Sequence, residues 1–72
     1  MNNKIINTVS EVLGVEVNDN TSQKNCDKWN SLRHLNIIIA LENTFDVTFE
    51  PEEIAEMKSV KDIEILLKSK LE

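Results

Sequence analysis

The sequence predicts an all-α fold, a small four-helix bundle with three longer helices and one short helix. Apolar residues recur at steps of three and four in separate stretches of the chain, which is the spacing of one helix face. No segment alternates apolar and polar residues over the length of a strand. A chain of 72 residues has room for one compact unit, so we expect a single domain over residues 1–72.

The first helix is expected over about residues 3–13. Apolar residues repeat there at steps of three and four: Ile5, Ile6, Val9, Val12 and Leu13. They stop at Gly14, the only glycine, which suits a helix C-terminus. The next stretch, residues 14–30, is rich in Asn, Asp, Thr, Ser and Lys and predicts a loop of unusual length. We expect Trp29 to attach the far end of this loop to the core.

The second helix is expected to begin at Ser31 and to run to Phe45. It carries apolar residues around more than half of its circumference, which predicts a central place in the bundle. We expect one side to face the core through Leu32, Leu35, Ile38, Ile39 and Phe45, with Ile37 and Leu41 widening the apolar arc.

A short third helix is expected to begin at Pro51, where the missing N–H is not needed, and to end near Met57. Ser59 and Asp62 then have the spacing of a capping box that opens the last helix. In that helix we expect four residues to face inward: Val60, Ile63, Leu66 and Leu67.

Charge and cysteine content limit the possible functions. The net charge of −5 disfavours nucleic acid as a partner, because such binding depends on Lys and Arg. Cys26 is the only cysteine and cannot form an internal disulfide, and no secretory apolar stretch is found near residue 1. The longest apolar run, Ile37 to Leu41, is too short to span a membrane. We therefore expect a cytoplasmic protein without a membrane span.

Ser31 stands out because it opens the second helix directly after the long loop. A serine there can cap the helix by accepting a backbone N–H. It can also carry a phosphate group, which the positive end of a helix stabilises. The residues alone leave both roles open.

Several short motifs together resemble the acyl carrier proteins. The segment from Trp29 to Leu35 contains an Asn-Ser-Leu variant of their Asp-Ser-Leu signature. The other motifs, in order along the chain, are Ile39-Ala40-Leu41-Glu42, Phe45-Asp46, Pro51-Glu52-Glu53 and Ser59-Val60. The resemblance covers nearly the whole chain, and its specificity comes from finding the signature at the start of the second of four helices.

The resemblance implies a carrier that is not itself an enzyme. In this family the serine, here Ser31, is esterified with 4′-phosphopantetheine, which a phosphopantetheinyl transferase takes from coenzyme A. Acyl or aminoacyl groups would then be carried as thioesters and presented to acyl-loading and acyl-consuming enzymes. We expect a monomer whose docking surface contains Asn30, Leu32, Arg33, His34, Ile37, Glu52 and Glu53. His34 is expected to be half exposed beside this surface.

The sequence departs from the family pattern at Asn30, which stands where aspartate is usual. Asparagine keeps the ability to cap the helix but removes a negative charge that the family uses through the metal ion of the transferase. Arg33 and His34 also introduce basic residues into a helix that is usually acidic, so we expect dedicated partners.

Two other functions remain as alternatives. The chain could be a carrier-like helical interaction module that is never modified. It could also be a small enzyme that uses Cys26 with His34, although no third group is placed to orient the histidine. A calcium loop is rejected because Lys24 and Asn30 occupy the positions that need Gly and Glu. No metal site is expected.

Overall fold

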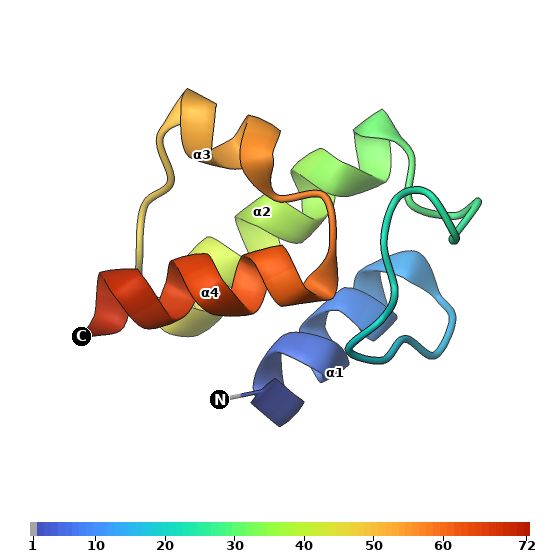
Figure 1. Cartoon of the computed structure of the whole chain (residues 1–72), viewed down its shortest axis with the longest axis horizontal. Coiled ribbons are helices and arrows are strands. Elements are labelled where there is room, and N and C mark those ends of the chain that lie inside the picture. The colour runs from blue at the N-terminus through green and yellow to red at the C-terminus, as the bar shows by residue number, and fades with distance from the viewer. Residues whose placement is uncertain (1) are drawn as a thin grey trace.

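The computed structural model describes residues 2–72, which form four helices joined by loops (Figure 1). Their bounds are α1 (Asn2–Leu13), α2 (Ser31–Phe45), α3 (Pro51–Glu56) and α4 (Val60–Leu71). Helix α1 packs against both α2 and α4, whereas the short α3 lies at the edge of the bundle away from α1 (Figure 1). These bounds confirm the predicted all-α bundle of three longer helices and one short helix.

The core is built from the inner faces of α1, α2 and α4. The residues with no exposed surface are Ile5, Val9, Ile37, Leu41, Val60, Ile63 and Leu67. Leu66, also expected to face inward, is partly buried and packs against this core. Helix α3 contributes no fully buried residue, but its Ile54 is partly buried and packs against this core.

Helix α2 turns a different face to the core than the sequence predicted. Its buried residues are His34, Ile37, Ile38 and Leu41. The expectation that Leu32, Leu35 and Ile39 point inward is wrong, because 68%, 53% and 57% of their surfaces are exposed. Apolar residues surround so much of this helix that periodicity could not choose the inner face. The contact of His34 with the buried Trp29 identifies the face that turns inward.

The long loop is attached to the bundle at its middle and at its end. An isolated antiparallel bridge joins Ser22 to Ser59, the residue before α4. At that point the Gln23 N–H donates to the Lys58 carbonyl at 2.9 Å, and the Val60 N–H donates to the Thr21 carbonyl at 3.0 Å. At the end of the loop, Trp29 is 3% exposed, which confirms the expectation that it attaches the loop to the core.

The helix ends follow the predicted signals with one difference. Gly14 adopts a positive φ of 73° after α1, a conformation that favours glycine. The Ser59 hydroxyl caps α4 by accepting the Asp62 N–H at 3.0 Å. The Asp62 carboxylate accepts the N–H of Lys58 at 3.2 Å, so the second half of the predicted capping box, a bond back to Ser59, is replaced. In residues 2–72 no helix combines the length and apolarity needed to cross a membrane.

Candidate functional site

Ser31 is the first residue of α2, and its side chain is exposed. The N-cap of this helix is Asn30, whose backbone is extended and whose side-chain oxygen accepts the Arg33 N–H at 2.9 Å. The capping role that the sequence left open for Ser31 therefore belongs to Asn30. The Ser31 hydroxyl lies at the surface and does not cap the helix.

Two consecutive side chains of α2 fix the position of this helix start. Arg33 donates from Nη1 to the carbonyl oxygens of Val12 at 3.1 Å and Leu13 at 3.2 Å, which end α1. His34 accepts at Nδ1 a hydrogen bond of 3.0 Å from Trp29 Nε1, and its Nε2 lies 2.8 Å from the carbonyl oxygen of Ile54 in α3. The turn that bears Ser31 is thereby connected to both α1 and α3.

The structure changes the composition of the expected docking surface. His34 is 9% exposed and Ile37 has no exposed surface, so the expectation that their side chains lie at the surface is wrong. Both belong to the face of α2 that packs on the core. Arg33 is half buried, and its guanidinium is bonded to the end of α1. Asn30 and Leu32 are exposed beside Ser31, as the docking prediction requires.

An apolar strip lies on the outer face of α2, and the sequence reasoning placed only its first residue, Leu32, on the docking surface. It consists of Leu32, Leu35 and Ile39, each more than half exposed. Leu35 and Ile39 follow Ser31 at steps of four, so the strip runs along the helix from the serine. The sequence did contain a signal for this strip, because α2 carries a second apolar face beside the face that packs on the core. We call Leu32, Leu35 and Ile39 the outer strip.

The two acidic residues expected to meet partners differ in their surroundings. Glu52 is exposed, whereas Glu53 forms an ion pair of 2.9 Å with Lys70 of α4. A hydrogen bond from the backbone N–H of Glu50, followed by the one from Lys70, lowers the pKa of the Glu53 carboxyl below its ordinary value. Lys70 also lies over the ring of Phe49, 5.5 Å from its centroid. Glu53 thus helps to hold α3 on α4.

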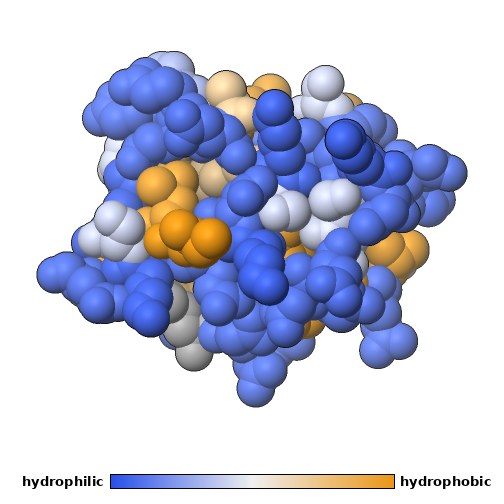
Figure 2. Space-filling view, in the orientation of Figure 1, coloured by the Kyte–Doolittle hydropathy of each residue, from blue (hydrophilic) through white to orange (hydrophobic). Residues whose placement is uncertain are grey.

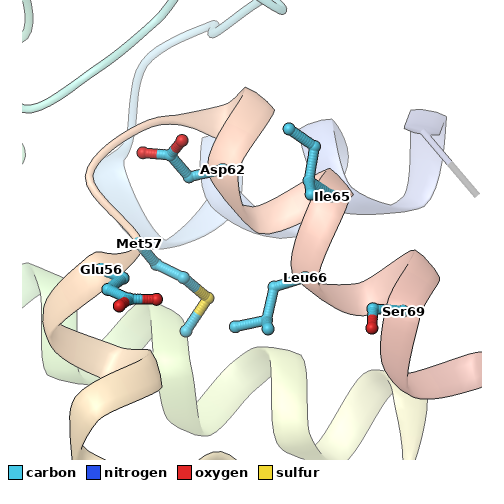
Figure 3. Close-up of a pocket in the computed structure, with 6 residues that line it drawn as sticks. All are labelled: Glu56, Met57, Asp62, Ile65, Leu66 and Ser69. Atoms are coloured by element: carbon cyan, nitrogen blue, oxygen red, sulfur yellow. The ribbon is translucent and has the colours of Figure 1, made fainter.

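A shallow groove lies between the end of α3 and α4, with a volume of about 280 Å³ (Figure 3). It is lined by Glu56, Met57, Asp62, Ile65, Leu66 and Ser69. An apolar patch is visible between α3 and α4 on a face that is otherwise largely hydrophilic (Figure 2). None of the predicted site residues lines this groove.

The proposed pairing of Cys26 with His34 is not formed. Both ring nitrogens of His34 are already engaged, one by Trp29 and the other by Ile54. A histidine in this state has no nitrogen available to activate a thiol. Among residues 2–72, no group of His, Cys, Asp and Glu side chains is arranged to hold a metal ion.

The start of α2 fits a covalently attached phosphate group. The Ser31 side chain is exposed, and the first N–H groups of a helix have no acceptor within the helix. These N–H groups and the helix dipole stabilise a negative charge at this end. A small helical bundle that presents such a serine has the features of a carrier protein, whose task is to display a tethered group.

Comparison with known families agrees with this class. The family model described as phosphopantetheine attachment site matches residues 3–67, which is most of the chain. The chain therefore belongs to the phosphopantetheine-carrying family, and its resemblance to the acyl carrier proteins is confirmed. Members of this family carry 4′-phosphopantetheine covalently and interact with partner enzymes. No curated protein matches the chain.

Proposed function

We propose that this chain is an acyl carrier protein in which Ser31 bears the 4′-phosphopantetheine arm. When bound, the arm supplies a terminal thiol that holds an acyl or aminoacyl group as a thioester. The observation that carries the proposal is that Asn30 caps α2, so that the Ser31 side chain is exposed and does not serve as the cap. The carrier itself then needs no acid, base or metal ion.

The modification transfers the phosphopantetheinyl group of coenzyme A to this chain. Ser31 Oγ attacks the phosphorus next to the pantetheine portion of coenzyme A and forms a new phosphoester bond. The bond from that phosphorus to the adenosine portion breaks, and adenosine 3′,5′-bisphosphate leaves. The hydroxyl proton passes to a base of the transferase. The product phosphate lies at the N-terminal end of α2, where a negative charge is stabilised by about 0.3–1 kcal/mol.

We place partner docking on the residues around Ser31 that the structure leaves exposed. The outer strip offers an apolar surface, and Asn30 lies beside it. Glu52 of α3 adds a carboxylate that suits a basic patch on a partner enzyme. The chain acts as a cytoplasmic monomer with a single domain over residues 1–72, and its partners are a phosphopantetheinyl transferase and the enzymes that load and consume the acyl group.

Intact-mass measurement tests the proposal. The purified protein is incubated with coenzyme A and a series of phosphopantetheinyl transferases, alongside Ser31→Ala and the matched control Ser69→Ala. Ser69 is an exposed serine of α4, so its loss leaves the start of α2 unchanged. We expect one phosphopantetheinyl increment on the wild type and on Ser69→Ala, and none on Ser31→Ala. A wild-type mass that stays unchanged with every transferase would instead identify a carrier-like interaction module that is never modified.

A further inference from the structure

His34 makes two side-chain hydrogen bonds in opposite directions, and together they fix its tautomer. The Trp29 indole N–H can only donate, so Nδ1 of His34 accepts and bears no proton. The carbonyl oxygen of Ile54 can only accept, so Nε2 of His34 donates. One neutral form of the ring, with its proton on Nε2, satisfies both bonds.

These bonds connect α3 to the residues that directly precede Ser31. The backbone N–H of His34 donates to the Asn30 carbonyl at 2.8 Å, and its ring binds Trp29, so it holds both residues of the turn. On the other side the ring holds Ile54. Helix α3 has no fully buried residue, so this buried bond adds to the packing of Ile54 and the Glu53–Lys70 ion pair that keep it on the bundle.

The connection is made away from water, which increases its importance. Trp29 is 3% exposed and His34 is 9% exposed. Among residues 2–72, no buried side-chain nitrogen or oxygen lacks a hydrogen-bond partner. Removal of the His34 ring would leave the buried indole N–H of Trp29 without an acceptor, and a stranded buried donor costs more than the bond itself contributes. The turn would relieve this cost by shifting Trp29, and Asn30 and Ser31 follow Trp29 in the chain.

We infer that His34 is a positioning residue for the modification of Ser31, a role that rests on the proposed function. It acts through Trp29 and Ile54 and holds Ser31 in a fixed relation to α3. A transferase that binds the surface around Ser31 then meets the hydroxyl at one place. Small displacements of a reacting group lower the rate strongly, so the loss of His34 should reduce kcat more than it raises KM.

Three variants separate the two bonds. In His34→Asn the side-chain oxygen lies near the position of Nδ1 and can still accept from Trp29, but the bond to Ile54 is lost. In His34→Gln the side-chain N–H reaches near the position of Nε2 and can still donate to Ile54. In His34→Ala both bonds are lost. Ile63→Val is the matched control, since it weakens the core in α4 and leaves both hydrogen bonds of the His34 ring in place.

Each protein is assayed with coenzyme A and a transferase that modifies the wild type, at a temperature where circular dichroism shows all variants folded. We expect kcat to fall about tenfold in His34→Ala, with smaller losses in His34→Asn and His34→Gln. Ile63→Val should keep the wild-type kcat, because lower stability alone does not change the rate of a folded protein. The nitrogen NMR shifts of His34 should show a proton on Nε2 and none on Nδ1.

The results that contradict the inference differ from those that contradict the proposed function. If no transferase modifies the wild type, the proposed function is wrong. If the wild type is modified and His34→Ala keeps its kcat, only the positioning role is wrong. A loss confined to KM would place His34 in docking and would also refute positioning. Should His34→Ala fail to fold, wild-type kcat in both His34→Asn and His34→Gln would refute it.

Discussion

Arg33 of α2 binds the carbonyl oxygen of Leu13, the last residue of α1, through a hydrogen bond of 3.2 Å from Nη1, and the same nitrogen reaches Val12 at 3.1 Å. The last carbonyls of a helix have no partner within the helix, and a cation there also complements the helix dipole. The resemblance to acyl carrier proteins had suggested Arg33 as a docking residue. The contact shows that it also ties the first helix to the turn that presents Ser31.

The removal of this guanidinium should therefore destabilise the fold. We expect Arg33→Met, which keeps an apolar stem, to lower the free energy of unfolding by about 1–2 kcal/mol. Urea denaturation measures this change. Lys61→Met, which removes an exposed cation of α4, is the control and should stay within about 0.5 kcal/mol of the wild type. Equal effects of the two substitutions would show that the Arg33 contact contributes nothing.

The inner face of α2 can be tested with a pair of substitutions to alanine. Ile37 has no exposed surface, whereas Leu35 is 53% exposed on the outer strip. We expect Ile37→Ala to cost about 2–5 kcal/mol, as for other buried aliphatic residues. Leu35→Ala should cost less than about 1 kcal/mol, because the Leu35 side chain is more than half exposed and its truncation leaves no cavity in the core. Chemical denaturation curves of the two variants would show the reverse order if the orientation of α2 were wrong.

Because Asn30 caps α2 and Ser31 does not, their alanine variants should differ in stability. Asn30→Ala removes the cap of α2 and should lower the free energy of unfolding by about 0.5–2 kcal/mol. Ser31→Ala should change it by less than about 0.5 kcal/mol, because its exposed hydroxyl does not cap the helix. Thermal melts followed by circular dichroism compare them. A large loss of stability in Ser31→Ala, with none in Asn30→Ala, would show that the serine caps the helix.

The Glu53–Lys70 ion pair should make stability depend on pH. The pKa of the Glu53 carboxyl is lowered in the folded protein, mainly by the Glu50 N–H and then by Lys70. The contribution is therefore present above the ordinary pKa of a glutamate and is lost as the pH falls through the folded pKa. The stability difference between the wild type and Glu53→Gln should shrink as the pH falls below about 4, and added salt should reduce it at neutral pH.

The exposed neighbour Glu52 provides the control for this titration. Glu52→Gln should follow the pH dependence of the wild type, since no contact to a cation is found for this side chain among the described residues. A difference between the wild type and Glu53→Gln that stays constant from neutral to acidic pH would contradict the role of the carboxylate charge.

Local signals in the sequence were sufficient to predict the helices. Gly14, Pro51 and Ser59 mark helix ends through backbone freedom, a missing N–H and a capping hydroxyl, and these effects involve only neighbouring residues. The resemblance also identified Ser31, and its exposure agrees with that assignment. Short-range chemistry therefore predicted the bundle, whereas the assignment of the candidate site to Ser31 came from the resemblance.

The orientation of α2 and the role of His34 depend on contacts that local signals do not specify. The ring of His34 is buried because it bonds Trp29 from the loop and Ile54, which is 20 residues away. A polar residue at a helix start is expected at the surface unless such partners exist. The expectation that Ile37 lies at the surface failed because apolar residues surround most of α2. The contacts of His34, which the sequence does not specify, decide which of these residues face the core.

The most direct test of the account is to locate the modification within the chain. After incubation with coenzyme A and a phosphopantetheinyl transferase, the protein is fragmented in the mass spectrometer. We predict that the phosphopantetheinyl group lies on Ser31, and that Asn30→Asp, which restores the carboxylate usual in the family, is modified faster by a broad-specificity transferase. A group found on any other residue, or an increment that persists in Ser31→Ala, would contradict the central claim that this exposed hydroxyl bears the arm.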